Sequence, residues 1–374
     1  MKKRGWIYVF RGLLLLLLAL WAFAPGFLAS EKPLLVLREG RLVHPAAADT
    51  AGGTILLRAP VRFDPQGMDR NYSGYVSPAE NLRRGGTHYL GTDELGRDTL
   101  AGLVAGVSAS LRVGVIASLL ALALALLPAL TSGYYASERK RAHFIILLCD
   151  VLFSLAALWT LYISLLTGAR VGILILCAVA SLWLFLRNRF RIGCIRRFPR
   201  LVFRYSPDAL LLRITDGYEL FPKIILLLVV FAFVGWKAGF LALLLGVAGW
   251  PFFYRYLRAD TMRIKALPFV RAALLQKVPA YALALRYFLP SLLPLILSLL
   301  PFMFIASVLA ETTLGFIGLG LDPAEITLGR MIAEGRTFPD AWWLMLFPSL
   351  VLSAMMGAFY LLGRRLSRRF SEEK

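Results

Sequence analysis

PFVRAALLQKVPAYALALRYFLP, residues 268–290, is a polar-edged segment between long apolar stretches. Pro268 suits the first turn of a helix, where its missing N–H has no intrahelical acceptor to lose. Pro279 disfavours helix at the residue before it, so this helix is predicted to end near Val278. A helix of about two to three turns is too short to cross a bilayer, which needs about 20 residues. The pattern is typical of a short helix that lies flat in a loop and binds a partner.

Basic residues surround this segment and lie within it. The bases in and around it are Arg255, Arg258, Arg263, Lys265, Arg271, Lys277 and Arg286. Cytoplasmic loops of membrane proteins are rich in Lys and Arg. We therefore expect the loop to face the cytoplasm.

The whole chain has the composition of a helical membrane protein. Of its 374 residues, 59% are hydrophobic and 17% are charged, and the mean hydropathy is +0.69. Several apolar runs of about 18 or more residues predict membrane-spanning helices. In a soluble protein the net charge of +20 would suggest a nucleic-acid partner. Here the bases cluster at the ends of apolar runs, which favours positive-inside topology and no nucleic acid.

The apolar runs predict about eight spans with both termini in the cytoplasm. We expect a cleaved signal peptide to be the weaker interpretation of the N-terminus, because further spans follow the first. Residues 30–105 carry acids and bases in equal number and no span-length run, so they are predicted to be extracytoplasmic, with extended structure near TILLRAPVRF. The predicted divisions are an N-terminal transmembrane helix at 1–29, the extracytoplasmic segment at 30–105, a second span at 106–136, a transmembrane hairpin and basic cytoplasmic loop at 137–207, further spans at 208–363 with the cytoplasmic loop at 258–290, and a cytoplasmic tail at 364–374.

Within residues 137–207, two apolar runs over 144–187 form the predicted hairpin. The arginine-rich segment that follows, 187–204, has the composition of a nucleic-acid-binding run. Anchoring to the anionic inner leaflet is the favoured interpretation, at about 1 kcal/mol of attraction for each base. Trp342 and Trp343, at the start of the last apolar run, fit an interfacial aromatic belt.

No catalytic, cofactor-binding or metal site is predicted. The sequence contains no phosphate-binding G-x-x-x-x-G-K-[ST] loop and no His-Glu-x-x-His motif. The cysteines have no metal-site spacing. TDELGRD, residues 92–98, could be a metal or carboxylate site, but a loop held by Asp/Arg pairs and glycine turns is favoured. Asp150 and Glu311 lie in apolar runs, where acids are functional candidates; for Glu311 a packing or capping role has similar weight.

Four stretches, in the same order, resemble the permeases of oligopeptide/dipeptide/nickel ABC importers. The family motif at the mouth of the second span is matched by Gly91, Thr92, Asp93, Gly96, Arg97 and Asp98. The four stretches are HYLGTDELGRDTLAGLVAGVSASLRVGV (88–115), DALLLRITDGYELFPKIILLLVV (208–230), RAALLQKVPAYALALRYFLP (271–290) and ETTLGFIGLGLDPAEITLGRMIAEGR (311–336). The third aligns with the cytoplasmic coupling loop of that family.

The resemblance implies an all-α, type I ABC importer permease with a core of six spans and an extra two-span hairpin. It implies an inner-membrane subunit that binds no cofactor and hydrolyses no ATP itself. The implied partners are a second homologous permease, two cytoplasmic ABC ATPases, an extracytoplasmic solute-binding protein and membrane lipid. The implied ATPase-coupling helix contains Val270, Arg271, Ala272, Ala273, Leu274, Leu275, Lys277 and Pro279, with Ala272 and Ala273 as the motif alanines seated in an ATPase groove.

Two residues depart from the family pattern in this loop. Arg271 stands where the family usually has Glu, and we expect the partner groove to be correspondingly acidic. Lys277 stands where the family has Gly, and a lysine with positive φ would cost roughly 1–2 kcal/mol. We expect Pro279 to supply the break instead.

Two other classes of protein are alternatives. A self-sufficient secondary transporter would show internal repeats and ionisable residues at the membrane midplane, and the sequence has no convincing repeat and few central charges. A membrane-embedded hydrolase would need paired catalytic groups that the sequence does not supply. Dependence on a separate ATPase would distinguish the importer from both.

Overall fold

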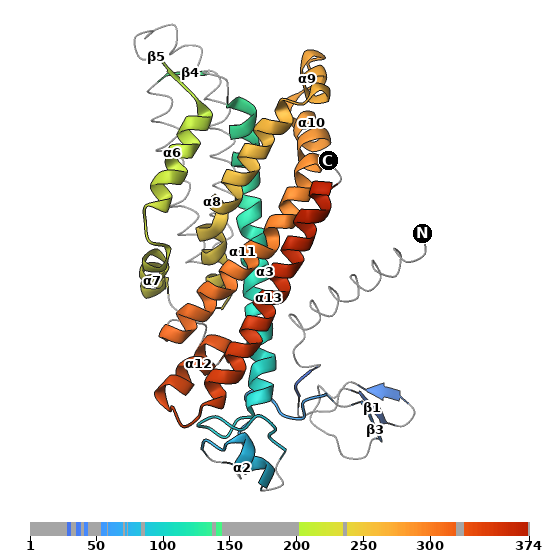
Figure 1. Cartoon of the computed structure of the whole chain (residues 1–374), viewed down its shortest axis with the longest axis vertical. Coiled ribbons are helices and arrows are strands. Elements are labelled where there is room, and N and C mark those ends of the chain that lie inside the picture. Colours follow the sequence, from blue (N-terminus) through green and yellow to red (C-terminus); the bar gives the residue numbers. More distant parts are fainter. Residues whose placement is uncertain are drawn as a thin grey trace.

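The computed structural model describes residues 28–30, 35–38, 41–43, 54–57, 59–69, 72, 74–83, 87–136, 140–143, 202–234, 238–318 and 325–372. These residues form a bundle of long helices with small β elements near its two ends (Figure 1). In chain order the elements are β1 (Leu35–Arg38), β2 (Arg41–Val43), β3 (Thr54–Leu57), α2 (Pro78–Arg83), α3 (Thr99–Tyr135), β4 (Lys140–His143), β5 (Val202–Tyr205), α6 (Pro207–Glu219), α7 (Lys223–Val234), α8 (Ala238–Lys265), α9 (Pro268–Leu275), α10 (Ala280–Leu283), the π-helix η4 (Ala284–Phe288), α11 (Leu289–Ile317), α12 (Leu328–Thr337) and α13 (Trp343–Glu372).

Four helices within the described residues are long and apolar enough to cross a membrane. They cover Thr99–Tyr135, Phe240–Lys265, Ala280–Ile317 and Trp343–Arg368. The prediction of a helical membrane protein is therefore confirmed. The predicted first span is described only at Leu28 and Ala29, where Leu28 accepts a hydrogen bond from the Val61 N–H. The predicted hairpin at 144–187, with Asp150, lies outside the described residues.

The bundle has two distinct ends. At one end α9 joins α8 to α11, and the C-terminus of α13 lies near it (Figure 1). We call this the α9 end. At the opposite end α2 and α12 surround the start of α3, and we call this the α12 end. The helices α3, α8 and α13 run toward the α9 end, and α11 runs away from it (Figure 1).

The largest helix–helix contact in the described bundle is that of α3 with α8. It is possible because α3 presents a small residue at every fourth position, which places all of them on one face. Each of the four alanines is fully buried. A small residue at each turn lets two helix backbones approach closely, as is common between membrane helices. The residues of this small-residue stripe are Ala117, Ala121, Ala125, Ala129 and Gly133.

Apolar clusters fill the bundle at both ends. At the α9 end, Ala121 to Ala129 of the stripe pack with Phe253, Leu257 and Phe288, and the inner face of α9 joins the same cluster. At the α12 end, Leu103 and Val107 of α3 pack with residues of α11, α12 and α13. The short helix α9 is thus continuous with the main core.

Three predicted boundaries differ from the structure. The helix α3 begins at Thr99, before the predicted boundary at 106, because Asp98 caps it. The predicted span that starts at 208 is two helices, α6 and α7, since Pro222 lacks an N–H and disfavours helix at the residue before it. The last helix continues through the predicted tail to Glu372.

The structure also contains β-strands, which the predicted all-α fold class did not include. A three-stranded antiparallel sheet has the order β2-β1-β3, and its strand β3 lies in the stretch predicted to be extended. A second pair joins β4 to β5 in antiparallel register, with Lys140 opposite Tyr205. This pairing brings the two sides of the predicted insertion together.

We predict that Gly133→Ala destabilises the protein. A Cβ at Gly133 would lie 2.6 Å from Cβ of Thr261 and 3.0 Å from the Arg258 carbonyl oxygen, so α3 and α8 would have to separate. Overpacking of this kind costs about 1–3 kcal/mol. The matched control is Gly357→Ala in α13, where no atom lies within 4 Å of the added methyl group. Thermal unfolding in detergent should show a loss for Gly133→Ala alone; equal midpoints would contradict the close contact.

Candidate functional site

The short helix predicted from residues 268–290 is present as α9. Leu267 precedes it with extended backbone angles, φ −68° and ψ 144°, and Pro268 occupies the first turn. The helix ends at Leu275, three residues before the predicted end at Val278. The element is therefore a helix of eight residues between two spans.

The end of α9 is a Schellman motif built on Lys277. The Val278 N–H donates to the Ala273 carbonyl at 3.2 Å, and the Lys277 N–H donates to the Leu274 carbonyl at 3.0 Å. Lys277 itself has φ of +58°, and it is the only non-glycine residue with positive φ in the described chain. This is the C′ position, where helices usually place glycine. The expectation that Pro279 replaces the left-handed turn is wrong: the turn is kept, with lysine in it.

The predicted coupling residues divide between two faces of α9. Val270 is fully buried and Ala273 is 4% exposed, and both pack in the apolar cluster of the α9 end. Arg271, Ala272 and Leu275 are exposed, and Leu275 is exposed to 85%. The expectation that both motif alanines enter a partner groove therefore holds geometrically for Ala272 alone, because the methyl group of Ala273 points into the chain's own core.

The exposed face of α9 continues beyond its end. It is an apolar surface with two bases in it, which we call the docking face. Leu274 and Val278 are half-buried at its edge. The residues of the docking face are Phe269, Arg271, Ala272, Leu275, Lys277, Pro279 and Tyr281.

Polar contacts fasten the α9 end to the bundle. The Lys265 ammonium donates to the Tyr134 carbonyl and lies 4.9 Å from the centroid of the Tyr134 ring. On the other side, Arg258 of α8 forms a two-fold hydrogen-bonded ion pair with Asp208 of α6. Ser132 of α3 also donates to Asp208. These contacts hold α3, α6 and α8 together immediately before α9.

After α10 the chain passes through one π-helical turn, η4. Pro290 follows directly, and in a regular α-helix its ring would clash with the carbonyl of Arg286. The wider π turn at Ala284–Phe288 avoids this clash. Phe288, at the end of η4, is buried in the same cluster as Val270.

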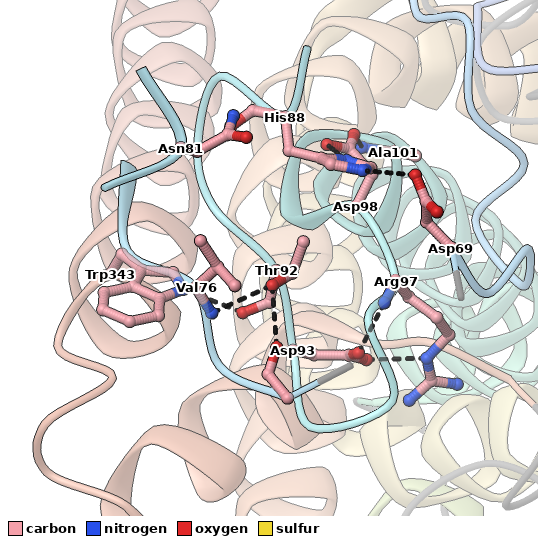
Figure 2. A network of polar contacts seen from close by, with 11 residues as sticks. Asp69, Val76, Asn81, His88, Thr92, Asp93, Arg97, Asp98, Ala101 and Trp343 are labelled. Carbon is pink, nitrogen blue, oxygen red and sulfur yellow. Dashed lines mark hydrogen bonds and ion pairs between the residues drawn. The ribbon is translucent and has the colours of Figure 1, made fainter. Parts of the chain in front are cut away.

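The family-motif residues lie at the α12 end, in a loop before α3 (Figure 2). Asp93 accepts from the Arg97 N–H at 2.8 Å and from Arg97 Nε at 2.6 Å. Gly91 and Gly96 have φ of +81° and +75°, so glycine is required at both turns. The favoured prediction for 92–98, a loop held by an Asp/Arg pair and glycine turns, is confirmed.

Thr92 links this loop to two other segments. Its hydroxyl donates to the Gly74 carbonyl and accepts from the Val76 N–H, both at 3.0 Å. Its carbonyl accepts from the indole N–H of Trp343 at 3.1 Å. Trp343 is only 3% exposed, so its prediction as an interfacial anchor is wrong, while Trp342 is half exposed.

His88, which was not among the predicted site residues, lies at the centre of this network. Its Nδ1 lies 2.9 Å from Asp98, and its Nε2 lies 3.4 Å from Asp69 (Figure 2). The ring is 1% exposed and stacks on Phe63 at 4.1 Å between centroids. Asp98 also accepts from the Ala101 N–H at 2.8 Å, which makes it the N-cap of α3. The signal in the sequence was the placement of His88 at the start of the quoted motif.

Burial changes the acidity of several groups at the α12 end. It raises the pKa of Asp98, against the hydrogen bonds from Ala101 and His88. It raises the pKa of Glu334 on α12, and the Asp93 carboxylate adds to this rise. It raises the pKa of Tyr75 to about 12. Within the described residues no group of three metal-binding side chains occurs.

Glu311 has a packing role. It is 1% exposed, and its carboxylate accepts from the Ser110 hydroxyl at 2.8 Å across the contact of α11 with α3. The alternative of a packing role is therefore supported by this contact.

Taken together, the fold is that of a multi-span membrane protein with a short exposed helix between two spans. The family model "Binding-protein-dependent transport system inner membrane component" matches residues 190–372. The match covers just under half of the chain, and over it the chain is similar to the permeases of peptide-type ABC importers.

Named relatives are similar to this chain over different lengths. A putative peptide transport system permease protein of Brucella suis is 34% identical over 157 residues, which are 42% of this chain and 53% of that protein. The matched stretch thus spans about half the length of that relative. The oligopeptide transport system permease protein OppC of Mycobacterium bovis is 24% identical, covering 90% of this chain and 92% of the relative. The glutathione transport system permease protein GsiD of Pectobacterium atrosepticum is 23% identical, covering 86% of each chain.

We predict that Lys277→Gly stabilises the protein by about 1 kcal/mol, because glycine adopts positive φ without the steric cost of a Cβ. The neighbouring substitution Gln276→Gly is the control, since Gln276 has φ of −74° and gains nothing. Unfolding in detergent measures both. A loss of stability in Lys277→Gly would mean that the lysine side chain contributes more than its backbone costs.

We predict that Asp98→Ala lowers stability by about 2 kcal/mol or more, because it removes both a helix cap and a partner of a buried histidine. Asp98→Asn keeps an acceptor for the Ala101 N–H and should lose less. Asp340→Ala, at an exposed position of the same end, is the control. The three midpoints are compared by thermal unfolding; if Asp98→Ala and Asp340→Ala unfold together, the network does not hold the start of α3.

Proposed function

We propose that this chain is the inner-membrane permease subunit of an ATP-binding-cassette importer and forms half of a translocation pathway for peptides or related small solutes. The observation that carries the proposal is the docking face of α9, exposed on a helix whose inner face is part of the bundle core. The match to the family model and the names of the relatives support it. None of the comparisons supports the alternative of a self-sufficient secondary transporter.

In this proposal α9 transmits force rather than performing chemistry. A helix that is exposed on one face and buried on the other cannot move without moving the spans packed on Val270 and Ala273. ATP-driven closure of two cytoplasmic ATPases would push the docking face and tilt α8 and α11 as rigid bodies, which is a known form of domain coupling. The chain itself would bind no cofactor and hydrolyse no ATP.

The proposed partners are a second homologous permease, two cytoplasmic ATPases and an extracytoplasmic solute-binding protein. The proposed topology has eight spans, both termini in the cytoplasm and residues 30–105 outside. Its support is the distribution of charge: bases flank α9 and end α13, as they do on the cytoplasmic side of membrane proteins. The substrate within the peptide class is open.

A tagged-chain purification tests the proposal. In mild detergent the chain should bring down a second permease and nucleotide-binding subunits, identified by mass spectrometry. A chain that purifies alone and still moves solute in proteoliposomes without ATP would establish the secondary transporter instead.

The bases of the docking face give a sharper test. We predict that Arg271→Glu weakens ATPase binding by about tenfold or more. The arginine would attract an acidic groove on the ATPase, and a glutamate at the same position would be repelled by it. Arg83→Glu makes the same charge change at an exposed position of α2, at the opposite end of the bundle, and is the control. Co-purified ATPase per permease is the measurement. Unchanged recovery with Arg271→Glu would argue against an acidic groove.

A further inference from the structure

A pocket beside the outer part of α3, which combines apolar and charged lining residues, is not used by any contact described above. One turn-spaced face of α3, carrying Ser108 and Arg112, forms one wall. Asp64 lies on a second wall, and Glu325, just before α12, lies on a third. The pocket has a volume of about 230 Å³. Three separate segments therefore converge on it.

Two buried polar atoms of this pocket have no hydrogen-bond partner. The hydroxyl of Ser108 is one, and its residue has no exposed surface. The Oε2 atom of Glu325 is the other. An unpaired buried polar atom costs about 1–3 kcal/mol, so such atoms indicate a group that the protein receives from outside.

Arg112 is the single charged residue of α3. No ion pair or hydrogen bond of its guanidinium occurs within the described part of the chain. A lone arginine in an otherwise apolar membrane helix is a functional candidate by default. Three groups in the pocket thus have no hydrogen-bond or ion-pair partner among the described residues: the guanidinium of Arg112, the Oε2 atom of Glu325 and the hydroxyl of Ser108.

We infer that this pocket binds the charged backbone ends of an amino-acid-sized part of a zwitterionic solute. Arg112 receives the carboxylate, Glu325 receives the ammonium group, and Ser108 donates to or accepts from the backbone between them. The volume of the pocket agrees with this assignment. Complete small-molecule sites usually measure about 300–1,000 Å³, and this pocket is smaller, so it holds only an amino-acid-sized part of the solute. The inference rests on the proposed function, because it names how a peptide-class solute is recognised in the pathway.

The test uses dialanine, N-acetyl-dialanine and dialanine amide as probes. Binding is measured on the purified full chain in detergent, and ATP-driven uptake is measured with the assembled transporter in proteoliposomes. The wild type should prefer dialanine over both blocked forms. Arg112→Gln should weaken dialanine binding about tenfold and abolish the preference for a free carboxylate, while keeping the preference for a free amine. Glu325→Gln should weaken dialanine binding and abolish the preference for a free amine, while keeping the preference for a free carboxylate.

Controls separate a lost contact from a lost fold. Arg213→Gln removes an exposed arginine on α6 and should change neither preference. Arg112→Lys keeps the positive charge and should retain part of the preference for a free carboxylate. Ser108→Ala, a third variant, removes the hydroxyl with little change of side-chain volume. ATPase activity of each assembled variant reports its integrity.

The outcomes are distinct. Uptake with unchanged preferences in both glutamine variants overturns the inference and leaves the proposed function intact. Binding with these charge preferences but without ATP-driven uptake supports the inferred binding pocket and contradicts the proposed importer function. If native mass spectrometry finds phosphatidylethanolamine held by the wild type and released by Arg112→Gln, with peptide preferences unchanged, the pocket is a lipid site and the inference is wrong.

Discussion

The close contact of α3 with α8 is the constraint on which the rest of the described structure depends. Membrane helices gain little from the hydrophobic effect between themselves, because lipid tails are as apolar as leucine. Close backbone approach and buried polar contacts must supply the stability instead. The small-residue stripe supplies the first, since Ala117 to Gly133 place nothing larger than a methyl group between the helices. The contacts of Asp208 with Ser132 and Arg258 supply the second.

This contact also gives the exposed helix its rigidity. The aromatic residues of α8 that pack on the stripe belong to the same cluster as Val270 and Ala273 of α9. A short helix on a mobile loop would bend when a partner pressed on it. Because half of α9 is part of the core, a force on its exposed side must pass to the long helices. At the α12 end of the bundle, the start of α3 is held in place by the helix cap at Asp98 and by the contacts of His88.

Much of this arrangement could be predicted from the sequence, and the failures have physical causes. Pro268 located the start of α9 correctly, because proline acts on the local backbone, whereas Pro279 placed the end near Val278 and the helix ends at Leu275. The left-handed turn at Lys277 was not expected, since the two hydrogen bonds to Ala273 and Leu274 outweigh the local steric cost. The early start of α3 is not visible in the hydropathy pattern, although Asp98 is a good capping residue.

Other features had no local signal, or one that the surrounding composition concealed. The indole of Trp343 meets the Thr92 carbonyl across most of the chain length, and nothing near Trp343 in sequence distinguishes it from the exposed Trp342. The division between α6 and α7 did have a signal in Pro222, which the apolar composition around it concealed. The pairing of the Ser110 hydroxyl with Glu311 joins residues that only the folded bundle brings together.

The π turn between α10 and α11 helps to set the direction in which α9 faces. A π turn holds one residue more than an α turn, and one residue corresponds to about 100° of rotation around a helix axis. The direction in which α9 faces is therefore set by residue count in Ala284–Phe288, not only by side-chain identity. A loss of one residue there would leave a regular helix and redirect the exposed face. A change of one residue in the length of this turn would thus redirect the docking face without altering any residue on it.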